Sequence, residues 1–121
     1  MMILKRIREV LRAEVIHGKD RMNMRILTAC GSDLLSDVLA FTKENSLLLT
    51  GLTNSQLIHT AEMVDIKAVC IVRGKKPGKE CVEMAKNKDI PLLRTDLPMF
   101  EACGRLYQAG LRGASEARKA G

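Results

Sequence analysis

Short apolar runs recur along the chain at regular intervals, and each run is followed by a turn and then by an amphipathic stretch. The runs are residues 25–29, 46–50, 67–72 and 91–95, and they are almost continuously apolar. Strands whose two faces are both covered have this character, and strands that alternate with helices are typical of βαβ units in a parallel sheet. Helical spacing of apolar residues predicts the intervening helices at 33–43, 54–65, 78–88 and 98–111.

The first part of the chain adds a helix and a short strand to this series. Apolar residues at helical spacing predict a helix over residues 2–12, and "EVIHG" predicts a strand that Gly18 ends. The fold class we expect is α/β, a single three-layer domain with a mainly parallel sheet of about four or five strands and covering helices. We expect this domain to span residues 1–111 and to be followed by a flexible basic tail, residues 112–121.

Capping signals mark the starts of the expected helices. Ser32 and Asp33 stand before the first of these helices, where the free N–H groups of a helix start accept polar side chains. Thr53 and Gln56 have the spacing of a capping box at the second. Pro98 suits the first turn of the last helix, because its missing N–H is not needed there.

Polar residues gather where the strands end, and this is the candidate binding site. In an open α/β sheet, ligands bind beyond the carboxyl ends of the strands. Two arginines, several hydroxyl groups and helix starts at one edge offer a place for a phosphate or a carboxylate. The candidate ligand-binding residues are Thr28, Gly31, Ser32, Asp33, Thr50, Thr53, Asn54, Arg73, Arg94 and Thr95.

The positive charge of the chain lies mainly at its two ends. Residues 1–25 carry seven Lys or Arg against three Asp or Glu, residues 112–121 carry three against one, and residues 26–111 carry ten of each. The alternative function is therefore an RNA-binding module that uses the basic termini. Aromatic residues make up only 2% of the chain, which disfavours a platform for stacking single-stranded bases.

The motifs of common enzyme classes are missing from the sequence. There is no Gly-x-Gly-x-x-Gly, "GKKPGKE" lacks the spacing of a phosphate-binding loop, and no His, Cys or acidic cluster has metal-ligand spacing. The four cysteines are expected to be reduced and mostly buried, and only Cys30, at a turn, is a candidate for a thiol-dependent activity. We expect no catalysis, no metal and no membrane span, and a cytoplasmic location.

Two segments give the chain a family resemblance. "SDLLSDVL" at residues 32–39 and the stretch "DIPLLRTDLPMFEACGRLY" at residues 89–107 are similar to the DRTGG domain family, over about residues 14–108. The motif that names the family is degraded here, since its positions fall on Asn23, Met24, Leu27, Thr28 and Ala29. The resemblance implies a small α/β domain related in fold to the N-terminal domain of HPr kinase/phosphorylase.

The resemblance also implies a function. Members of this family are regulatory or assembly domains, commonly dimeric, that occur beside CBS modules and sometimes accompany redox enzymes. We therefore expect a non-catalytic regulatory or assembly domain that homodimerises and binds an anionic metabolite or nucleotide at the strand ends. A redox enzyme complex is the expected regulatory partner, and neither a resident cofactor nor a nucleic acid is part of this interpretation.

Overall fold

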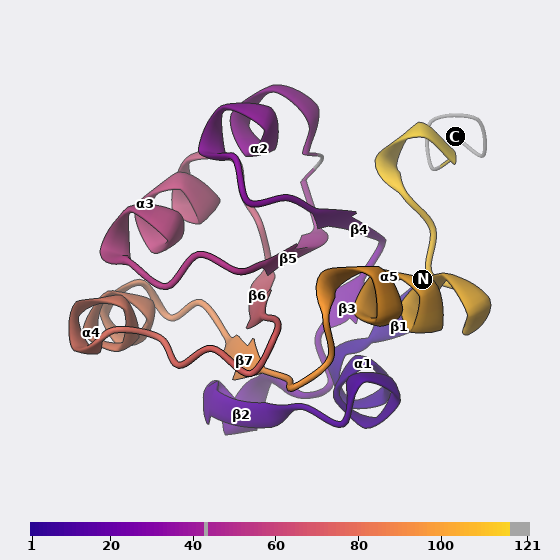
Figure 1. Cartoon of the computed structure of the whole chain (residues 1–121), viewed down its shortest axis with the longest axis horizontal. Coiled ribbons are helices and arrows are strands. Elements are labelled where there is room, and N and C mark those ends of the chain that lie inside the picture. Colours follow the sequence, from indigo (N-terminus) through magenta and orange to yellow (C-terminus); the bar gives the residue numbers. More distant parts are fainter. Residues whose placement is uncertain (43, 117–121) are drawn as a thin grey trace.

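The computed structural model, which describes residues 1–42 and 44–116, is built around one five-stranded sheet (Figure 1). The strand order is β2-β7-β6-β5-β4, and β4 to β7 are parallel while β2 pairs antiparallel with β7. The mainly parallel α/β domain expected from the sequence is therefore confirmed. The strands of the sheet are β2 (Glu14–His17), β4 (Thr28–Gly31), β5 (Ser46–Thr50), β6 (Ala68–Ile71) and β7 (Leu92–Arg94).

Helices cover both faces of the sheet and make the three layers. Because β4 to β7 lie side by side in chain order, their connecting helices all fall on one face, as right-handed crossovers require. The helices of that face are α2 (Leu35–Phe41), α3 (Ser55–Met63) and α4 (Lys79–Lys88). The other face is covered by α1 (Leu4–Leu11) and α5 (Met99–Gln108), which contact each other.

The two faces of the sheet hold separate apolar cores. In β5, Leu47 and Leu49 face the core beneath α1 and α5, whereas Leu48 faces the core beneath α3 and α4. All three side chains are 0–1% exposed. A strand buried on both faces has no polar positions, which explains why these runs are continuously apolar in the sequence.

The segment around residue 26 is the main place where the expected elements were wrong. The single strand predicted over residues 25–29 is two strands, because β3 (Arg25–Ile26) pairs antiparallel with β1 (Met2–Ile3) and β4 begins only at Thr28. The helix predicted over residues 2–12 accordingly starts at Leu4. A single turn of 3-10 helix, η1 (Lys19–Arg21), occupies the loop after β2.

The described structure continues past residue 111, the expected boundary of the domain. Arg112 forms a parallel bridge with Thr28, and its carbonyl accepts the Ala29 N–H at 3.0 Å, so this segment runs beside the outer edge of β4. Glu116 accepts a hydrogen bond from the Tyr107 hydroxyl at 2.5 Å and pairs with Arg112 at 3.3 Å. The remainder of the expected tail, residues 117–121, lies outside the described residues.

Among the described helices, none has both the length and the apolar character needed to cross a membrane.

Candidate functional site

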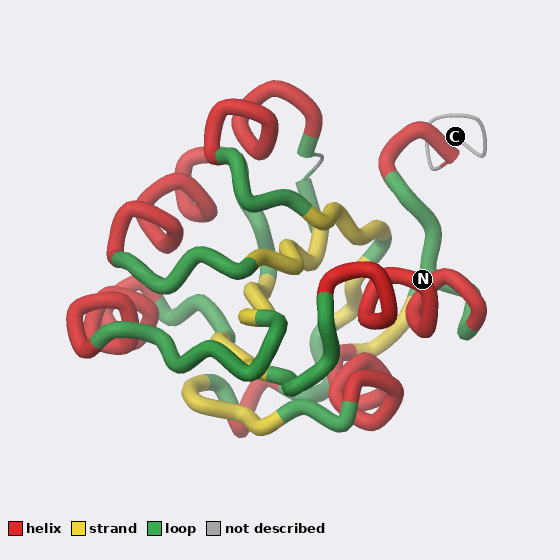
Figure 2. Tube along the Cα trace, viewed as in Figure 1, coloured by secondary structure: helices red, strands yellow, loops and turns green. Residues whose placement is uncertain are grey.

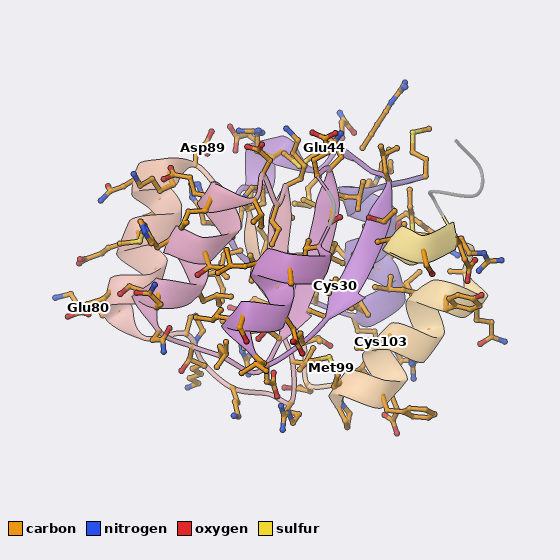
Figure 3. All side chains as sticks on the ribbon, turned by 90° about the horizontal axis from the view of Figure 1, so that it is seen from above. Cys30, Glu44, Glu80, Asp89, Met99 and Cys103 are labelled. Atoms are coloured by element: carbon orange, nitrogen blue, oxygen red, sulfur yellow. The ribbon has the colours of Figure 1, made fainter. Side chains whose placement is uncertain are left out.

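The carboxyl ends of the four parallel strands lie along one edge of the sheet, which we call the rim. Figure 2 shows the loops that lead from each of these strands to the next helix. In Figure 3, Glu80 and Met99, at the starts of α4 and α5, lie toward this edge, and Glu44 and Asp89 lie toward the opposite one. The polar strand ends of the sequence thus meet along the same side of the molecule, as βαβ topology requires.

Asp33, from the loop after β4, is the central group of the rim. Its Oδ1 accepts the Gly51 N–H at 2.5 Å and lies 3.4 Å from the Thr50 hydroxyl, which donates to it. Its Oδ2 accepts a hydrogen bond from the Arg73 guanidinium. One carboxylate therefore links the carboxyl ends of β4, β5 and β6.

These contacts determine the charge state of Asp33. Partial burial raises the pKa of its carboxyl, but the Gly51 N–H, the Arg73 guanidinium and the Thr50 hydroxyl together outweigh that effect, and the pKa lies below its ordinary value. The Asp33–Arg73 pair is thus ionised at neutral pH. Both side chains remain more than a third exposed, so the pair is open to solvent and to ligands.

Gly51 makes room for this ion pair. A Cβ at this buried position would lie 2.5 Å from Arg73 Nη2 and 3.2 Å from Asp33 Oδ1. A glycine here allows the close approach of Arg73 and Asp33, a signal visible in the sequence only as "TG" after a strand. Gly51 was not among the candidate residues, and it belongs to the site.

The predicted helix cap at Ser32 and Asp33 is wrong in its detail. The N-cap of α2 is Leu34, which has no side-chain cap bond, because Asp33 turns to Gly51 and Arg73 instead. The Ser32 hydroxyl accepts the Leu34 N–H at 3.1 Å and so stabilises the turn before the helix. Gly31 ends β4 beside α5, where a Cβ would lie 2.8 Å from Cys103 Sγ.

Two other candidate residues lie at the rim in a separate groove. Thr53 and Asn54 line a cavity of about 420 Å³ between the starts of α3 and α4. Asn54 is the N-cap of α3 and its Oδ1 accepts the Leu57 N–H at 3.2 Å, so the capping box predicted at Thr53 and Gln56 is wrong. The Thr53 carbonyl accepts the Gly78 N–H at 2.9 Å and ties the two helix starts together.

The last three candidates are occupied by structural contacts. Thr28 lies at the amino end of β4, away from the rim, and its hydroxyl is 2.6 Å from that of Ser46. Arg94 donates to the Gly74 carbonyl at 2.8 Å and pairs with Glu14 at 3.2 Å. The buried Thr95 hydroxyl donates to the Leu11 carbonyl at 2.6 Å, which fixes the end of α1 to the sheet.

The thiol proposed for chemistry lies beside an apolar cavity. Cys30 and Cys103 both line a space of about 150 Å³ between β4, α5 and the segment near Arg112 (Figure 3). Burial, and then the nearby Cys30, raise the pKa of the Cys103 thiol above its ordinary value. The raised pKa favours the thiol form of Cys103, which is less nucleophilic than a thiolate.

The structure is a three-layer α/β domain whose parallel strands end at a polar, solvent-open rim. The sequence matches the DRTGG domain over residues 6–109. The chain therefore belongs to the DRTGG domain family. Among curated proteins, none matched the sequence.

One solved structure supports the same fold. It contains the CBS and DRTGG domains of the regulatory region of Clostridium perfringens pyrophosphatase, complexed with the activator diadenosine tetraphosphate. The match has a TM-score of 0.73 at 19% sequence identity, and it covers 88% of this chain. It covers 46% of the other chain, so the present sequence spans about half of that regulatory region.

Proposed function

We propose that this protein is a regulatory or assembly domain that pairs with a second copy of itself and acts by binding rather than by catalysis. The observation that carries the proposal is the distribution of exposed large apolar side chains. Four of them belong to segments at the β4 end of the sheet: Leu34 and Leu39 to the N-cap and body of α2, Leu27 to the residue before β4, and Phe100 to α5 on the other face. Figure 1 shows these elements around β4. We call them the β4-side patch: Leu27 (47% exposed), Leu34 (57%), Leu39 (45%) and Phe100 (87%).

Exposure of these apolar side chains to water is energetically unfavourable. A phenylalanine side chain exposed to this degree contributes to stability only when it is covered, and apolar patches on soluble domains commonly mark protein interfaces. The segments that carry these residues surround the edge strand β4, and an isologous contact between two copies on this side would bury the residues of both copies. Membership of a family that includes a domain from a regulatory region supports the same function.

The oligomeric state of the purified chain tests this proposal. Light scattering is expected to give twice the chain mass of 13.4 kDa for the wild type. Leu34→Glu and Phe100→Glu are expected to give monomers, because each places a charge in the contact and both positions are exposed. Met63→Glu, at an exposed apolar position on α3 outside the patch, is the matched control and stays dimeric. A wild type that is still monomeric at about 0.1 mM, a concentration at which even a weak dimer is populated, contradicts the proposal.

The rim supplies the ligand-binding part of the proposed function. An anionic metabolite or nucleotide binds there by replacing Asp33 as the partner of Arg73, with the Gly51 N–H as a further donor. When a phosphate replaces the Asp33 carboxylate at Arg73, it takes the space that the carboxylate occupied, so no new cavity is needed. The exchange also releases the loop between β4 and α2, which contains Asp33. Titration of the wild type and of Arg73→Gln with acetyl phosphate and ADP tests this part, and equal binding by both proteins contradicts it.

A further inference from the structure

A second polar groove lies on the opposite side of the sheet from α3 and α4, between α1, β2 and η1. Its volume is about 720 Å³, within the range of small-molecule sites. Four cationic side chains line it, three from α1 and its end and one from η1. The lining residues that we call the basic groove are Lys5, Arg8, Arg12, Ala13, Glu14, Val15, Lys19 and Met22.

The cations of this groove are unneutralised. Within residues 1–42 and 44–116, no carboxylate lies within ion-pair distance of Lys5, Arg8, Arg12 or Lys19. The acid of the lining, Glu14, pairs with Arg94 at 3.2 Å. The groove therefore concentrates most of the positive charge of the N-terminal part of the chain at one place.

Helix stability accounts for only part of these charges. A cation near the carboxyl end of a helix is favoured by the helix dipole, which suits Arg8 in the last turn of α1. Lys5 lies in the first turn, where a cation is disfavoured, and that turn contains no acidic residue to offset it. Lys5, Arg8 and Arg12 follow one another at helical spacing, so like charges repel along one face. An anion between them would remove both costs.

The groove has a fixed shape before any ligand arrives. The Lys5 N–H donates to the Met22 carbonyl at 2.8 Å, which holds the segment after η1 against the start of α1. The Ala13 N–H donates to the Arg8 carbonyl at 3.0 Å and closes the far end of the helix. Its floor is apolar, since Ala13 is buried and Val15 and Met22 are half-buried. Main-chain bonds thus hold the segments that carry the cations around an apolar floor.

We infer that the basic groove binds a small organic phosphate with two or more phosphate groups, its phosphates on the cations and its apolar part on Val15 and Met22. The cations on α1 extend over about 10 Å at the rise of a helix, a length that a short phosphate chain can span. A single-stranded nucleic acid fits less well, because such sites stack bases on aromatic rings and none lines the groove. The site is distinct from the rim and does not depend on the proposed function.

Isothermal titration of the full chain at low salt tests the inference. The probes are ATP and inorganic tripolyphosphate, with adenosine as the uncharged comparison and a structured RNA as the rival ligand. The wild type is expected to bind ATP more tightly than tripolyphosphate, with dissociation constants below about 1 mM, and not to bind adenosine. Lys5→Gln and Arg8→Gln should each weaken ATP binding about tenfold, the effect of losing one charged contact.

Matched variants separate the groove from general charge and from the rim. Arg6→Gln removes the same charge from an exposed position of α1 that does not line the groove, and Arg73→Gln removes it from the rim. Arg6→Gln is expected to bind ATP as the wild type does. Loss of ATP binding in Arg73→Gln but not in Arg8→Gln would mean that the nucleotide binds at the rim, and it would overturn the inference. Lys19→Gln, on η1, repeats the test without altering the helix. The inference is overturned by no heat with ATP or tripolyphosphate at millimolar concentration, by equal losses in Arg6→Gln and Arg8→Gln, or by binding of RNA alone.

Discussion

At the scale of single residues, the rim depends on Gly51 as much as on the charged pair beside it. The ion pair crosses directly over this position, so a methyl group there would displace the guanidinium. The displaced atoms belong to the free end of a flexible side chain that is 42% exposed, which makes the displacement cheap. A substitution at Gly51 can therefore disturb the Asp33–Arg73 ion pair with little effect on the stability of the folded domain.

Gly51→Ala is expected to raise the pKa of Asp33 toward its ordinary value, because the carboxylate loses Arg73. The unfolding free energy should fall by less than about 1 kcal/mol, as for other exposed pairs. The lowered pKa of Asp33 stabilises the folded state at pH values above the unfolded-state pKa of about 4. This stabilisation is lost as the pH falls through the folded-state pKa. The stability difference between the two proteins should therefore be present at neutral pH and shrink in acid.

Carboxyl chemical shifts of Asp33, followed by NMR against pH, measure this directly. A second measurement, the melting temperature between pH 2 and 7, reports the linked stability. An unchanged Asp33 titration in Gly51→Ala would mean that Arg73 does not contribute to the lowering of this pKa. Gly104→Ala, at an exposed position where a Cβ meets nothing, controls for the effect of removing a glycine.

At the scale of elements, the start of α3 shows what the sequence could and could not reveal. The sequence "TNSQ" fits two alternatives equally well: a capping box that starts at Thr53, or an N-cap at Asn54, one residue later. Both place a side-chain oxygen near the free N–H groups of the helix start. The structure selects Asn54, because the Thr53 carbonyl is already used by Gly78. A contact with a loop distant in sequence decided between two locally equivalent choices.

Asn54→Ala is expected to cost about 1 kcal/mol of unfolding free energy, the usual value of a lost N-cap. Thr53→Ala should change it by less than about 0.5 kcal/mol, since its side chain does not cap the helix. Urea denaturation of both variants provides the comparison. A larger loss in Thr53→Ala than in Asn54→Ala would restore the capping box.

The remaining elements follow the same division between local and distant information. The strand over 46–50 was predicted at its true limits, because both of its faces are buried and its sequence is apolar throughout. The prediction of a single strand over 25–29 was wrong. The segment divides into β3 and β4 because β3 pairs with Met2 and Ile3, which lie more than twenty positions away. At the rim, polar residue types indicated Asp33 and Arg73, but only the fold shows that they bond to each other and that Thr28 lies elsewhere.

At the scale of the whole molecule, the central sheet shields one thiol completely. Cys70 is 0% exposed in β6, the middle strand of the sheet, and burial raises its pKa to about 12. Both the absence of access and the absence of thiolate prevent its reaction with an alkylating reagent. Cys30 and Cys103 are only half-buried, at the edge strand and on α5.

Cysteine labelling with iodoacetamide under native conditions is therefore expected to modify Cys30 and Cys103 before Cys70. Cys70 should react only when the whole domain opens, at a rate that rises with urea as the global unfolding constant does. Mass spectrometry of peptides after timed labelling measures each site. Fast reaction of Cys70 in native buffer would contradict a sheet that stays covered on both faces.

The helices that cover the second face have a consequence for synthesis of the chain. The face opposite α2, α3 and α4 is closed by α1 and α5, whose buried side chains form one apolar core with Leu47, Leu49 and Leu93. A ribosome delivers α1 first and α5 only after every strand of the sheet. The part of this face that α5 covers therefore stays exposed until the last helix emerges, and the nascent domain is open to chaperones up to that moment.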